Sequence, residues 1–458
     1  MTKPVAPREM LRAGLCTGCG TCAALAVRDE VRLDWDRDGQ LKPVGPPAWT
    51  HRPDERFARL CPFSPLADNE DVLATARFPD SRHDPWIGRF QAAYVGHAAE
   101  QDYRERGSSG GMVSWVAAEL LKRGLVDGVA HVGRADPAAD GRLFRYRISR
   151  DIAALKDGAQ SRYYPVDMAQ ILREMREIPG RYAVVGIPCF IKAVHLTRAA
   201  DPVLRDRIAF TLGLVCGHMK SRDMVESFAW QMDVDIRAVA KVDYRVKDES
   251  RPANWYTARL TCRDGQQHQR DWWHLVDGDW GSGFFQNRAC DFCDDVVADT
   301  ADIAFGDAWV EPYSSDGRGT NVVVVRSPLL HAMLHDAIEE GRLSLQEVAA
   351  DFVRQTQAAG FRQRREGLAY RLAWLSPGLR PRKRVEAGGR LGWRRKLIYR
   401  LRHYISRMSS TAFRLSKALG RPGLFLLWGR SILALYHGLT YSRGRLGRMF
   451  DRAERVWK

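Results

Sequence analysis

The sequence has no long hydrophobic run and no apolar segment at its N-terminus. Its most apolar stretch, residues 424–439, is shorter than a membrane-spanning helix and contains Arg430, His437 and two glycines. Residues 1–11 are polar and contain prolines, so they lack the apolar core of a secretory signal. These absences argue against a secreted or membrane-spanning protein, and we expect the chain to be cytoplasmic.

Several other common signals are missing. The chain contains no internal repeat, no low-complexity tract and no RNA-binding motif. It also lacks the Walker pattern and the G-x-G-x-x-G pattern of dinucleotide-binding folds. What remains is an ordinary globular composition, with 458 residues and a hydrophobic fraction of 45%. A chain of this length has room for two or three domains.

Acidic residues are scarce in one part of the chain only. Residues 380–458 contain 21 Lys and Arg against 3 Asp and Glu, a net charge of +18, whereas the rest of the chain carries −2. The overall charge of +16 is therefore not spread over the protein. Since the body is nearly neutral and no RNA-binding motif is present, we expect no nucleic-acid partner.

The basic segment also contains bulky apolar residues at spacings of three and four, which predict amphipathic helices over residues 380–458. These residues include Trp393, Leu397, Ile398, Leu401, Tyr404, Ile405, Phe413, Leu415 and Leu419. Two interpretations remain open. The helices lie on an anionic membrane surface at the inner face of the membrane, or they pack on the body or on a partner.

Eight of the nine cysteines fall into two sets of four. The first set begins with a C-x-x-C-x-x-C run, Cys16, Cys19 and Cys22, and is completed by Cys61, which is followed by proline. This pattern is typical of bacterial ferredoxins, in which four thiolates hold a [4Fe–4S] cluster. Zinc and disulfides are the alternatives, but zinc is usually held by two pairs.

Only one such run is present, whereas a two-cluster ferredoxin has two. We therefore expect a ferredoxin-like domain with a single cluster over residues 1–80. Gly18 and Gly20 should allow its loop to bend around the cluster. Nine cysteines in this arrangement also favour a reducing compartment.

The second set consists of Cys189, Cys216, Cys290 and Cys293. Residues 182–186 and 208–215 are predicted strands, so Cys189 and Cys216 each follow a strand, where an open α/β sheet places its ligands. The spacing alone leaves two alternatives open, a second cluster or two core cysteines beside a zinc-type C-x-x-C pair. Cys262 is left over, in a polar strand-like segment.

Further strands are predicted at residues 91–98, 126–132, 301–305 and 321–325, with a helix that ends at Gly124. This alternation predicts an α/β core with a mixed sheet.

A glycine loop, residues 107–111, opens directly onto the predicted helix. Backbone amides, the hydroxyls of Ser108 and Ser109 and the helix dipole can together bind an anion there. Such loops are also often simple helix starts. A phosphate-bearing flavin beside iron–sulfur clusters would be chemically sensible, because a flavin links one-electron and two-electron chemistry.

Several ordered motifs together resemble the family of coenzyme F420 hydrogenase/dehydrogenase beta subunits. The motifs are Gly-Ser-Ser-Gly-Gly-Met at 107–112, Gly-Leu-Val-Asp-Gly at 124–128, Ser-Arg-Tyr-Tyr at 161–164, Val-Gly-Ile-Pro-Cys at 185–189, Val-Cys-Gly-His at 215–218, the pair Cys290 and Cys293, and Ala-Asp-Ile-Ala-Phe-Gly-Asp at 301–307. The resemblance covers residues 16–326 and leaves out the basic tail. Family members include F420-reducing hydrogenase subunits and ferredoxin-dependent reductases of chlorophyll-type pigments, and similar proteins occur in bacterial surface-polysaccharide gene clusters.

The resemblance implies an oxidoreductase with FAD and two [4Fe–4S] clusters, whose core would span residues 85–375. Ser108, Ser109, Gly110 and Gly111 would lie against the FAD phosphates, Arg162 and Tyr163 near the flavin, and Asp307 at the same crevice. Cys189, Cys216, Cys290 and Cys293 match the positions that hold a [4Fe–4S] cluster in the family. His218 is a candidate proton donor, or it hydrogen-bonds to a cluster sulfur or the backbone.

We therefore expect electrons to pass between ferredoxin or reduced F420 and an organic substrate through the clusters and FAD. A role in surface-polysaccharide biosynthesis is one expectation. Two other classes of function remain open, an electron-transfer subunit with no organic substrate of its own and a non-redox protein whose cysteines hold zinc.

Overall fold

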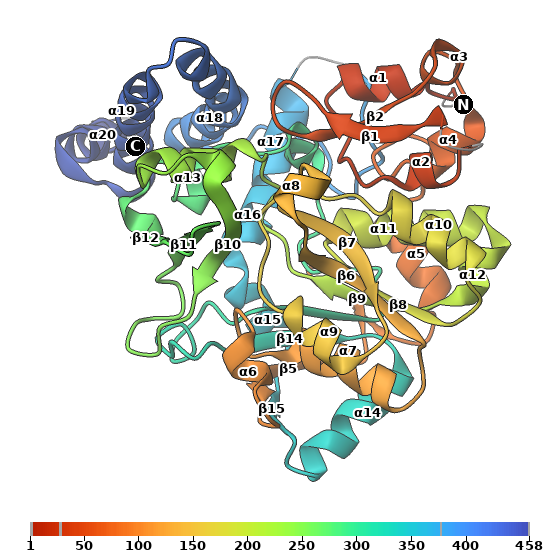
Figure 1. The fold of residues 1–458 in the computed structure, drawn as a ribbon. Helices are drawn as coiled ribbons and strands as arrows, with labels where there is room; N and C mark the ends of the chain where they lie inside the picture. Colours follow the sequence, from red (N-terminus) through yellow and green to blue (C-terminus); the bar gives the residue numbers. More distant parts are fainter. Residues whose placement is uncertain (1–2, 27–29, 376–377, 457–458) are drawn as a thin grey trace.

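The computed structural model describes the chain except for residues 1–2, 27–29, 376–377 and 457–458 (Figure 1). The ends of the expected N-terminal and C-terminal segments therefore lie outside the described residues. The remainder is a mixed α/β fold with a large central sheet and a group of long helices at the C-terminus.

An eight-stranded mixed sheet forms the centre, with the strand order β15-β5-β14-β13-β9-β8-β6-β7. The strands are β5 (Ala92–Ala98), β6 (Gly128–Arg134), β7 (Phe144–Ser149), β8 (Tyr182–Gly186), β9 (Ile208–Leu214), β13 (Ile303–Asp307), β14 (Asn321–Val325) and β15 (Leu343–Glu347). The four inner strands β6, β8, β9 and β13 are parallel, and the strands on both sides of them pair antiparallel. The predicted mixed sheet is confirmed.

The expected strands at 182–186 and 321–325 coincide with β8 and β14, and β5, β6 and β9 differ from expectation by at most two residues at either end. The strand expected at 301–305 is shifted to β13, so Asp307 ends the strand instead of following it. The reason is the antiparallel partner, because the ladder with β14 continues until Asp307 pairs with Asn321.

Alternate residues of the strands face opposite layers of helices. In β8, Ala183 and Val185 pack in the same apolar cluster as α7 (Met112–Lys122) and α14 (Pro328–Glu339). Tyr182 and Val184 pack on the other side in a cluster with α10 (Ala169–Glu177), α11 (Pro188–Ala200) and α12 (Pro202–Arg207). The short helices α6 (Tyr103–Arg106), α8 (Pro137–Asp140) and α9 (Ile152–Asp157) lie in connections.

The N-terminal part packs on the α10–α11 side of the sheet. It contains α1 (Pro7–Arg12), α2 (Thr21–Ala24), the hairpin of β1 (Arg32–Trp35) and β2 (Leu41–Val44), α3 (Pro47–Thr50) and α4 (Glu55–Leu60). Next come α5 (Glu70–Arg77) and the hairpin of β3 (Arg82–Asp84) and β4 (Gly88–Phe90). The long insertion between Cys22 and Cys61 thus includes the β1–β2 hairpin.

A smaller antiparallel sheet stands beside the large one. It consists of β10 (Val239–Val246), β11 (Thr257–Cys262) and β12 (Gln267–Asp271) and packs with α13 (Asp223–Gln231). The single-turn helices η2 (Ile236–Ala238), η3 (Trp272–His274), η4 (Trp280–Ser282) and η5 (Arg288–Phe292) flank it and lead back to β13.

The described part of the chain ends in six helices. The first three, α15 (Ala350–Thr356), α16 (Ala358–Arg364) and α17 (Glu366–Trp374), lie near the middle of Figure 1. The last three, α18 (Trp393–Ala418), α19 (Pro422–Tyr441) and α20 (Gly444–Val456), pack with the smaller sheet at the upper left of Figure 1. Phe413 and Phe425 are buried against Phe285, and Ser409 Oγ accepts a hydrogen bond of 2.8 Å from the Phe285 amide. The predicted tail helices are confirmed, and one of their faces packs on the body.

No helix in the described part of the chain combines the length and the apolar character needed to span a bilayer.

We expect the tail to contribute to stability through Phe425, which is fully buried. Phe425→Ala should lower the free energy of unfolding by about 3 to 5 kcal/mol, because it opens a cavity between two aromatic layers. Leu427→Ala is the matched control two residues away, where the side chain is 66% exposed, and it should change stability by less than about 0.5 kcal/mol. Denaturant unfolding followed by tryptophan fluorescence measures both, and equal effects would contradict the packing described.

Candidate functional site

The first four cysteines line one cavity. Cys16 and Cys19 lie in the loop between α1 and α2, Cys22 lies in α2, and Cys61 follows α4. The space between them, open solvent included, is about 400 Å³, and Leu33 and Pro43 of the β1–β2 hairpin also line it. The insertion between Cys22 and Cys61 therefore supplies an apolar wall of the cavity.

The loop that carries Cys16 and Cys19 depends on two glycines. Gly18 and Gly20 have φ angles of +77° and +87°, where a side chain is strained. A Cβ atom on Gly18 would also lie 2.5 Å from the carbonyl oxygen of Leu41. The expected role of both glycines in bending the loop is confirmed.

The thiols of this first set are close enough to affect one another. Burial, and then the neighbouring thiols of Cys19 and Cys16, raises the pKa of Cys61 above its ordinary value. The pKa of Cys22 is raised by burial and by the other three cysteines. Four thiolates together in such a site require positive charge between them, as a metal cluster would supply.

The second set of cysteines also converges. Cys189 lies in the first turn of α11, Cys216 follows β9, and Cys290 and Cys293 lie in and just after η5. Burial, and then Cys293, Cys216 and Cys290 in that order, raises the pKa of Cys189 well above its ordinary value. The fold therefore brings together four thiols that are up to about a hundred residues apart in the sequence.

A buried arginine contacts this second set. Arg364, at the end of α16, donates from Nη1 to Cys293 Sγ and from Nη2 to the carbonyl oxygens of Cys216 and Gly217 at 2.7 and 2.8 Å. Burial opposes its charge, but the thiols of Cys293, Cys216 and Cys290 more than offset this and raise the pKa of Arg364. Arg364 thus provides a permanent positive charge beside the four thiols.

The two sets of cysteines are neighbours in one hydrophobic core. Cys19, Cys189 and Cys293 all belong to the same buried cluster, and the thiol of Cys19 contributes to the raised pKa of Cys189. Tyr146 of β7 is near both sets, because burial and the thiols of Cys189 and Cys19 raise its pKa. A short path of low polarity therefore connects the sets.

The arrangement differs from that of a single bound ion. Within the described residues, no three His, Cys, Asp or Glu side chains are placed to hold one metal ion. Each thiolate of a cubane cluster binds a different iron, so the four sulfurs surround a volume instead of meeting at a point. Two sets of four free cysteines, each with buried and half-buried members and one of them lining a cavity, fit such clusters.

The glycine loop stands at the N-terminus of α7, as expected. Gly111 caps the helix with a φ of +80°, and a Cβ atom there would lie 2.3 Å from the Tyr103 carbonyl oxygen. Ser108 Oγ accepts a hydrogen bond from the Ser161 amide at 2.8 Å, and Ser109 Oγ donates to the Thr320 carbonyl oxygen at 3.0 Å. Within the described residues, the amides from Ser108 to Gly111 donate no hydrogen bond. They remain available to an anion.

Lysine and arginine side chains surround this loop. Lys247 donates to the carbonyl oxygens of Arg104 and Ser109, and the latter bond is 3.0 Å. Burial, and then the charges of Arg104 and Arg245, lowers the pKa of Lys247 to about 8. A half-buried ammonium group that contacts only carbonyl oxygens in these bonds is suited to a phosphate. The loop and Lys247 therefore fit a phosphate-bearing cofactor.

The other predicted flavin-site residues divide into two groups. Asp307 receives two hydrogen bonds of 3.0 Å from Arg245, and both groups influence the pKa of the half-buried Tyr163. Ser161 connects this group with the glycine loop, because its amide donates a hydrogen bond to Ser108 Oγ. Arg162, in contrast, lies 5.1 Å from the ring of Phe144 and bonds to residues 159–161. Its buried Nε has no partner within the described residues.

An aromatic series connects the second cysteine set with Tyr163. His218 stacks on Trp280 at 4.4 Å between ring centres, and Trp280 lies 4.8 Å from Tyr163. Gly217 permits this approach, since a Cβ atom there would lie 2.3 Å from Trp280 Nε1. His218 is buried, and burial together with Lys220 and Arg402 holds its pKa well below the ordinary value. His218 is therefore an interior residue between two sites.

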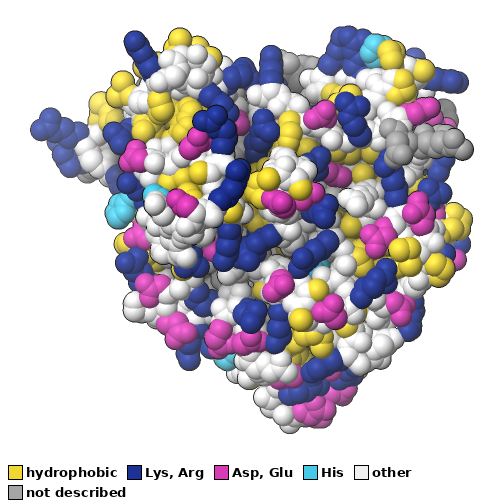
Figure 2. All heavy atoms as spheres, in the orientation of Figure 1, with side chains coloured by type: hydrophobic (Ala, Val, Ile, Leu, Met, Phe, Trp, Pro, Cys, Tyr) yellow, Lys and Arg dark blue, Asp and Glu magenta, His cyan; other side chains and the backbone are white. Residues whose placement is uncertain are grey.

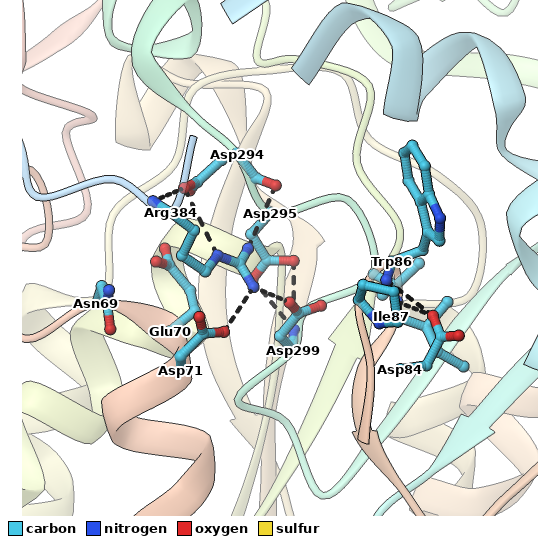
Figure 3. Close-up of polar contacts among 12 residues, drawn as sticks. Asn69, Glu70, Asp71, Asp84, Trp86, Ile87, Asp294, Asp295, Asp299 and Arg384 are labelled. Carbon is cyan, nitrogen blue, oxygen red and sulfur yellow. Dashed lines mark hydrogen bonds and ion pairs between the residues drawn. The ribbon is translucent and has the colours of Figure 1, made fainter. Parts of the chain in front are cut away.

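The start of the C-terminal segment crosses a cluster of carboxylates (Figure 3), two of which, Asp294 and Asp295, directly follow Cys293. Lys383 Nζ lies 3.0 Å from Asp294, and the amide of Arg384 donates to Asp294 at 2.9 Å. Figure 3 shows the Arg384 guanidinium between carboxylates, with ion pairs to Asp71 at 3.2 Å and to Asp299. The C-terminal segment is thus bound to the loop that follows the cysteine pair.

Sequence reasoning missed several of these residues. Arg364, Arg245, Lys247 and Trp280 have no motif of their own, and only the fold shows that they contact the predicted residues. The glycine at 217 was a usable signal, because a residue without a side chain next to Cys216 indicates a close neighbour.

Two family models match this chain. The family model for the N-terminal part of the coenzyme F420 hydrogenase/dehydrogenase beta subunit matches residues 93–173, and the model for its C-terminal part matches residues 180–351. A relative in Methanosarcina mazei, one of the subunits of the F420H2 dehydrogenase, is 22% identical over 306 residues, which cover 65% of this chain and 77% of the relative.

A chain of the F420-reducing [NiFe] hydrogenase complex from Methanosarcina barkeri is also similar, with 17% identity and a TM-score of 0.49. The match covers 65% of this chain and 98% of that chain. The two family models together match more than half of the sequence. The chain belongs to the family of coenzyme F420 hydrogenase/dehydrogenase beta subunits.

Proposed function

We propose that the chain is an iron–sulfur flavoprotein oxidoreductase that passes electrons between a one-electron donor or reduced F420 and an organic substrate. The family itself is one of oxidoreductase subunits. The observation that carries the proposal is the adjacency of the two cysteine sets in one core, together with the aromatic series from Cys216 toward the glycine loop.

The proposal assigns a [4Fe–4S] cluster to each set of four cysteines and FAD to the crevice of Ser108, Ser109, Gly110, Gly111, Tyr163 and Asp307. When bound, the clusters carry single electrons, and the flavin converts between one-electron and two-electron chemistry. The protein binds these cofactors and shields them from water. The shared apolar core excludes water, Arg364 offsets thiolate charge, and the free amides with Lys247 bind phosphate.

The relative in Methanosarcina mazei supports F420 as the redox partner, since it belongs to an F420H2 dehydrogenase. Ferredoxin is the alternative donor in the proposal. Because the chain resembles proteins of surface-polysaccharide gene clusters, intermediates of surface-polysaccharide biosynthesis are the first class of substrate to screen.

A second candidate function is that of an electron-transfer subunit with no organic substrate of its own. Its support is that the curated relative is itself a subunit. The two candidates differ in what the isolated chain can do. An enzyme with its own substrate turns over alone, whereas a subunit transfers electrons only when its protein partner is added.

The first test is anaerobic mixing of the purified chain with reduced F420 or with reduced ferredoxin. We expect one of these donors to bleach the flavin absorbance with about two electrons per FAD. Gly111→Ala should lose the response because its Cβ would strain the loop, and Cys262→Ser, outside the site, should keep it. If neither donor bleaches the protein, the proposed electron path is wrong.

Iron analysis tests the assignment of the cysteines. The unaltered chain should contain about eight irons, and Cys61→Ser or Cys290→Ser should each reduce this to about four. Cys262→Ser should retain about eight, since Cys262 lies in β11, away from both sets. A chain that keeps all its iron after either of the first two substitutions would contradict the assignment. Colorimetric iron and sulfide assays are sufficient.

The affinity for FAD should depend on the protonation of Lys247. Burial lowers the pKa of Lys247 to about 8, so its positive charge is present below that pH and is lost as the pH rises through it. We expect FAD to bind more weakly as the pH rises from about 7 to 9. Lys247→Met should bind FAD at least about tenfold more weakly at pH 7 and show little of this dependence.

Fluorescence titration of flavin-stripped protein measures both effects. Lys241→Met is the matched control, because Lys241 lies in β10, which ends just before Lys247, and pairs with Asp243. Parallel pH profiles for Lys247→Met and the unaltered chain would show that Lys247 does not bind the phosphates.

A further inference from the structure

The outward faces of the tail helices are rich in exposed apolar side chains. Of the sixteen large hydrophobic residues that are exposed in the described chain, nine lie between residues 397 and 449. The most exposed are Leu427 at 66%, Leu415 at 59%, Leu419 and Met449, both at 54%, and Tyr441 at 48%. Over half of the exposed bulky apolar residues thus lie in a small part of the chain.

These side chains are ordered along the helices. In α18, Leu397, Tyr404 and Leu415 are spaced by seven and eleven residues, so they lie on one face of the helix. Ile405 and Phe413 of the same helix are buried against the body. The helix therefore has two apolar faces, and only one of them packs against the body.

Helix α19 repeats this arrangement. Leu424, Leu427 and Tyr441 are exposed, whereas Phe425 and Tyr436 are buried. In α20, Leu446 and Met449 are exposed. Packing on the body thus accounts for the apolar residues on one side of the tail helices, whereas those on the other side are exposed to solvent.

Arginines without carboxylate partners lie among these exposed residues. Arg421, Arg430, Arg445 and Arg448 are exposed, and no ion pair of theirs is found in the described part of the chain. The two carboxylates of α20, Asp451 and Glu454, contact Arg394 instead. The exposed side of the tail is therefore both apolar and strongly positive.

Figure 2 shows this side in part. Hydrophobic side chains gather at the upper left of the view, over the region of α18 to α20 in Figure 1, and Lys and Arg side chains lie around them. Acidic side chains are more frequent over the lower half of this view.

We propose that this face of α18, α19 and α20 docks on the anionic headgroup surface of a lipid bilayer. The exposed Leu, Met and Tyr side chains enter the interface, and the unpaired arginines contact lipid phosphates. The charge decides for lipid over a second copy of the chain, because two such positive faces repel one another. The helices lie along the surface, since none of those described is long and apolar enough to cross it.

Vesicle flotation of the full-length chain tests the proposal. Vesicles of phosphatidylcholine with phosphatidylglycerol are compared with vesicles of phosphatidylcholine alone, at low and high salt. We expect binding to the anionic vesicles only, with weaker binding at high salt. Leu427→Asp with Met449→Asp, and separately Arg445→Gln with Arg448→Gln, should each weaken binding by about tenfold or more.

Two control variants lie on other elements. Leu329→Asp in α14 changes a side chain that is 47% exposed, and Arg205→Gln in α12 removes an exposed arginine, so both should bind like the unaltered chain. Unchanged thermal unfolding of every variant excludes a folding defect.

The proposal is overturned if the unaltered chain fails to float with anionic vesicles, or if the tail variants float as well as the controls. It is also overturned if Leu427→Asp with Met449→Asp converts an oligomer into a monomer in light scattering while vesicle binding is absent. That result would identify the face as a protein interface.

Discussion

The structure depends on gathering eight thiols from distant segments, six of which lie in or against one apolar core. Cys16, Cys19 and Cys22 come from the N-terminal loop and α2, and Cys61 follows α4. Cys189 lies at the start of α11, Cys216 follows β9, and the pair Cys290 and Cys293 lies in and just after η5. Burial alone makes thiolates costly, as the raised pKa values of Cys61 and Cys189 indicate. Positive charge must offset them, and Arg364 provides part of it beside the second set. Helix α16, which carries Arg364, and the 383–384 segment, which pairs with Asp294 and Asp299, are therefore both bound next to the second cysteine set.

Local patterns in the sequence predicted the parts of the site that local chemistry determines. The strands β8 and β14 are short apolar runs bounded by breaking residues, and Gly111 marks a helix start that only glycine tolerates. The C-x-x-C-x-x-C run is similarly local. Its partner Cys61 was identified by the proline that follows it, and the fold places it at the same cavity. The assignment of metal and flavin to these residues remains a prediction.

Contacts between distant segments could not be predicted in this way. Arg364 is one of many arginines on short helices, and only tertiary packing places its guanidinium against Cys293 and the Cys216 carbonyl. Asp307 was expected to close the crevice, but its pairing with Arg245 depends on how β10 lies beside the large sheet. Arg162 lies over the ring of Phe144, a contact that no local pattern indicates. The periodicity of the tail indicated helices, yet a helix with two apolar faces does not reveal which face is buried.

Electron paramagnetic resonance of the chemically reduced, anaerobically purified chain tests the central claim, that two clusters share one core. The account predicts a broadened spectrum from two magnetically interacting [4Fe–4S] clusters. In Cys61→Ser this should give way to the narrow spectrum of one isolated cluster. A spectrum of a single cluster in the unaltered chain, or two unbroadened spectra that simply add, would contradict the account.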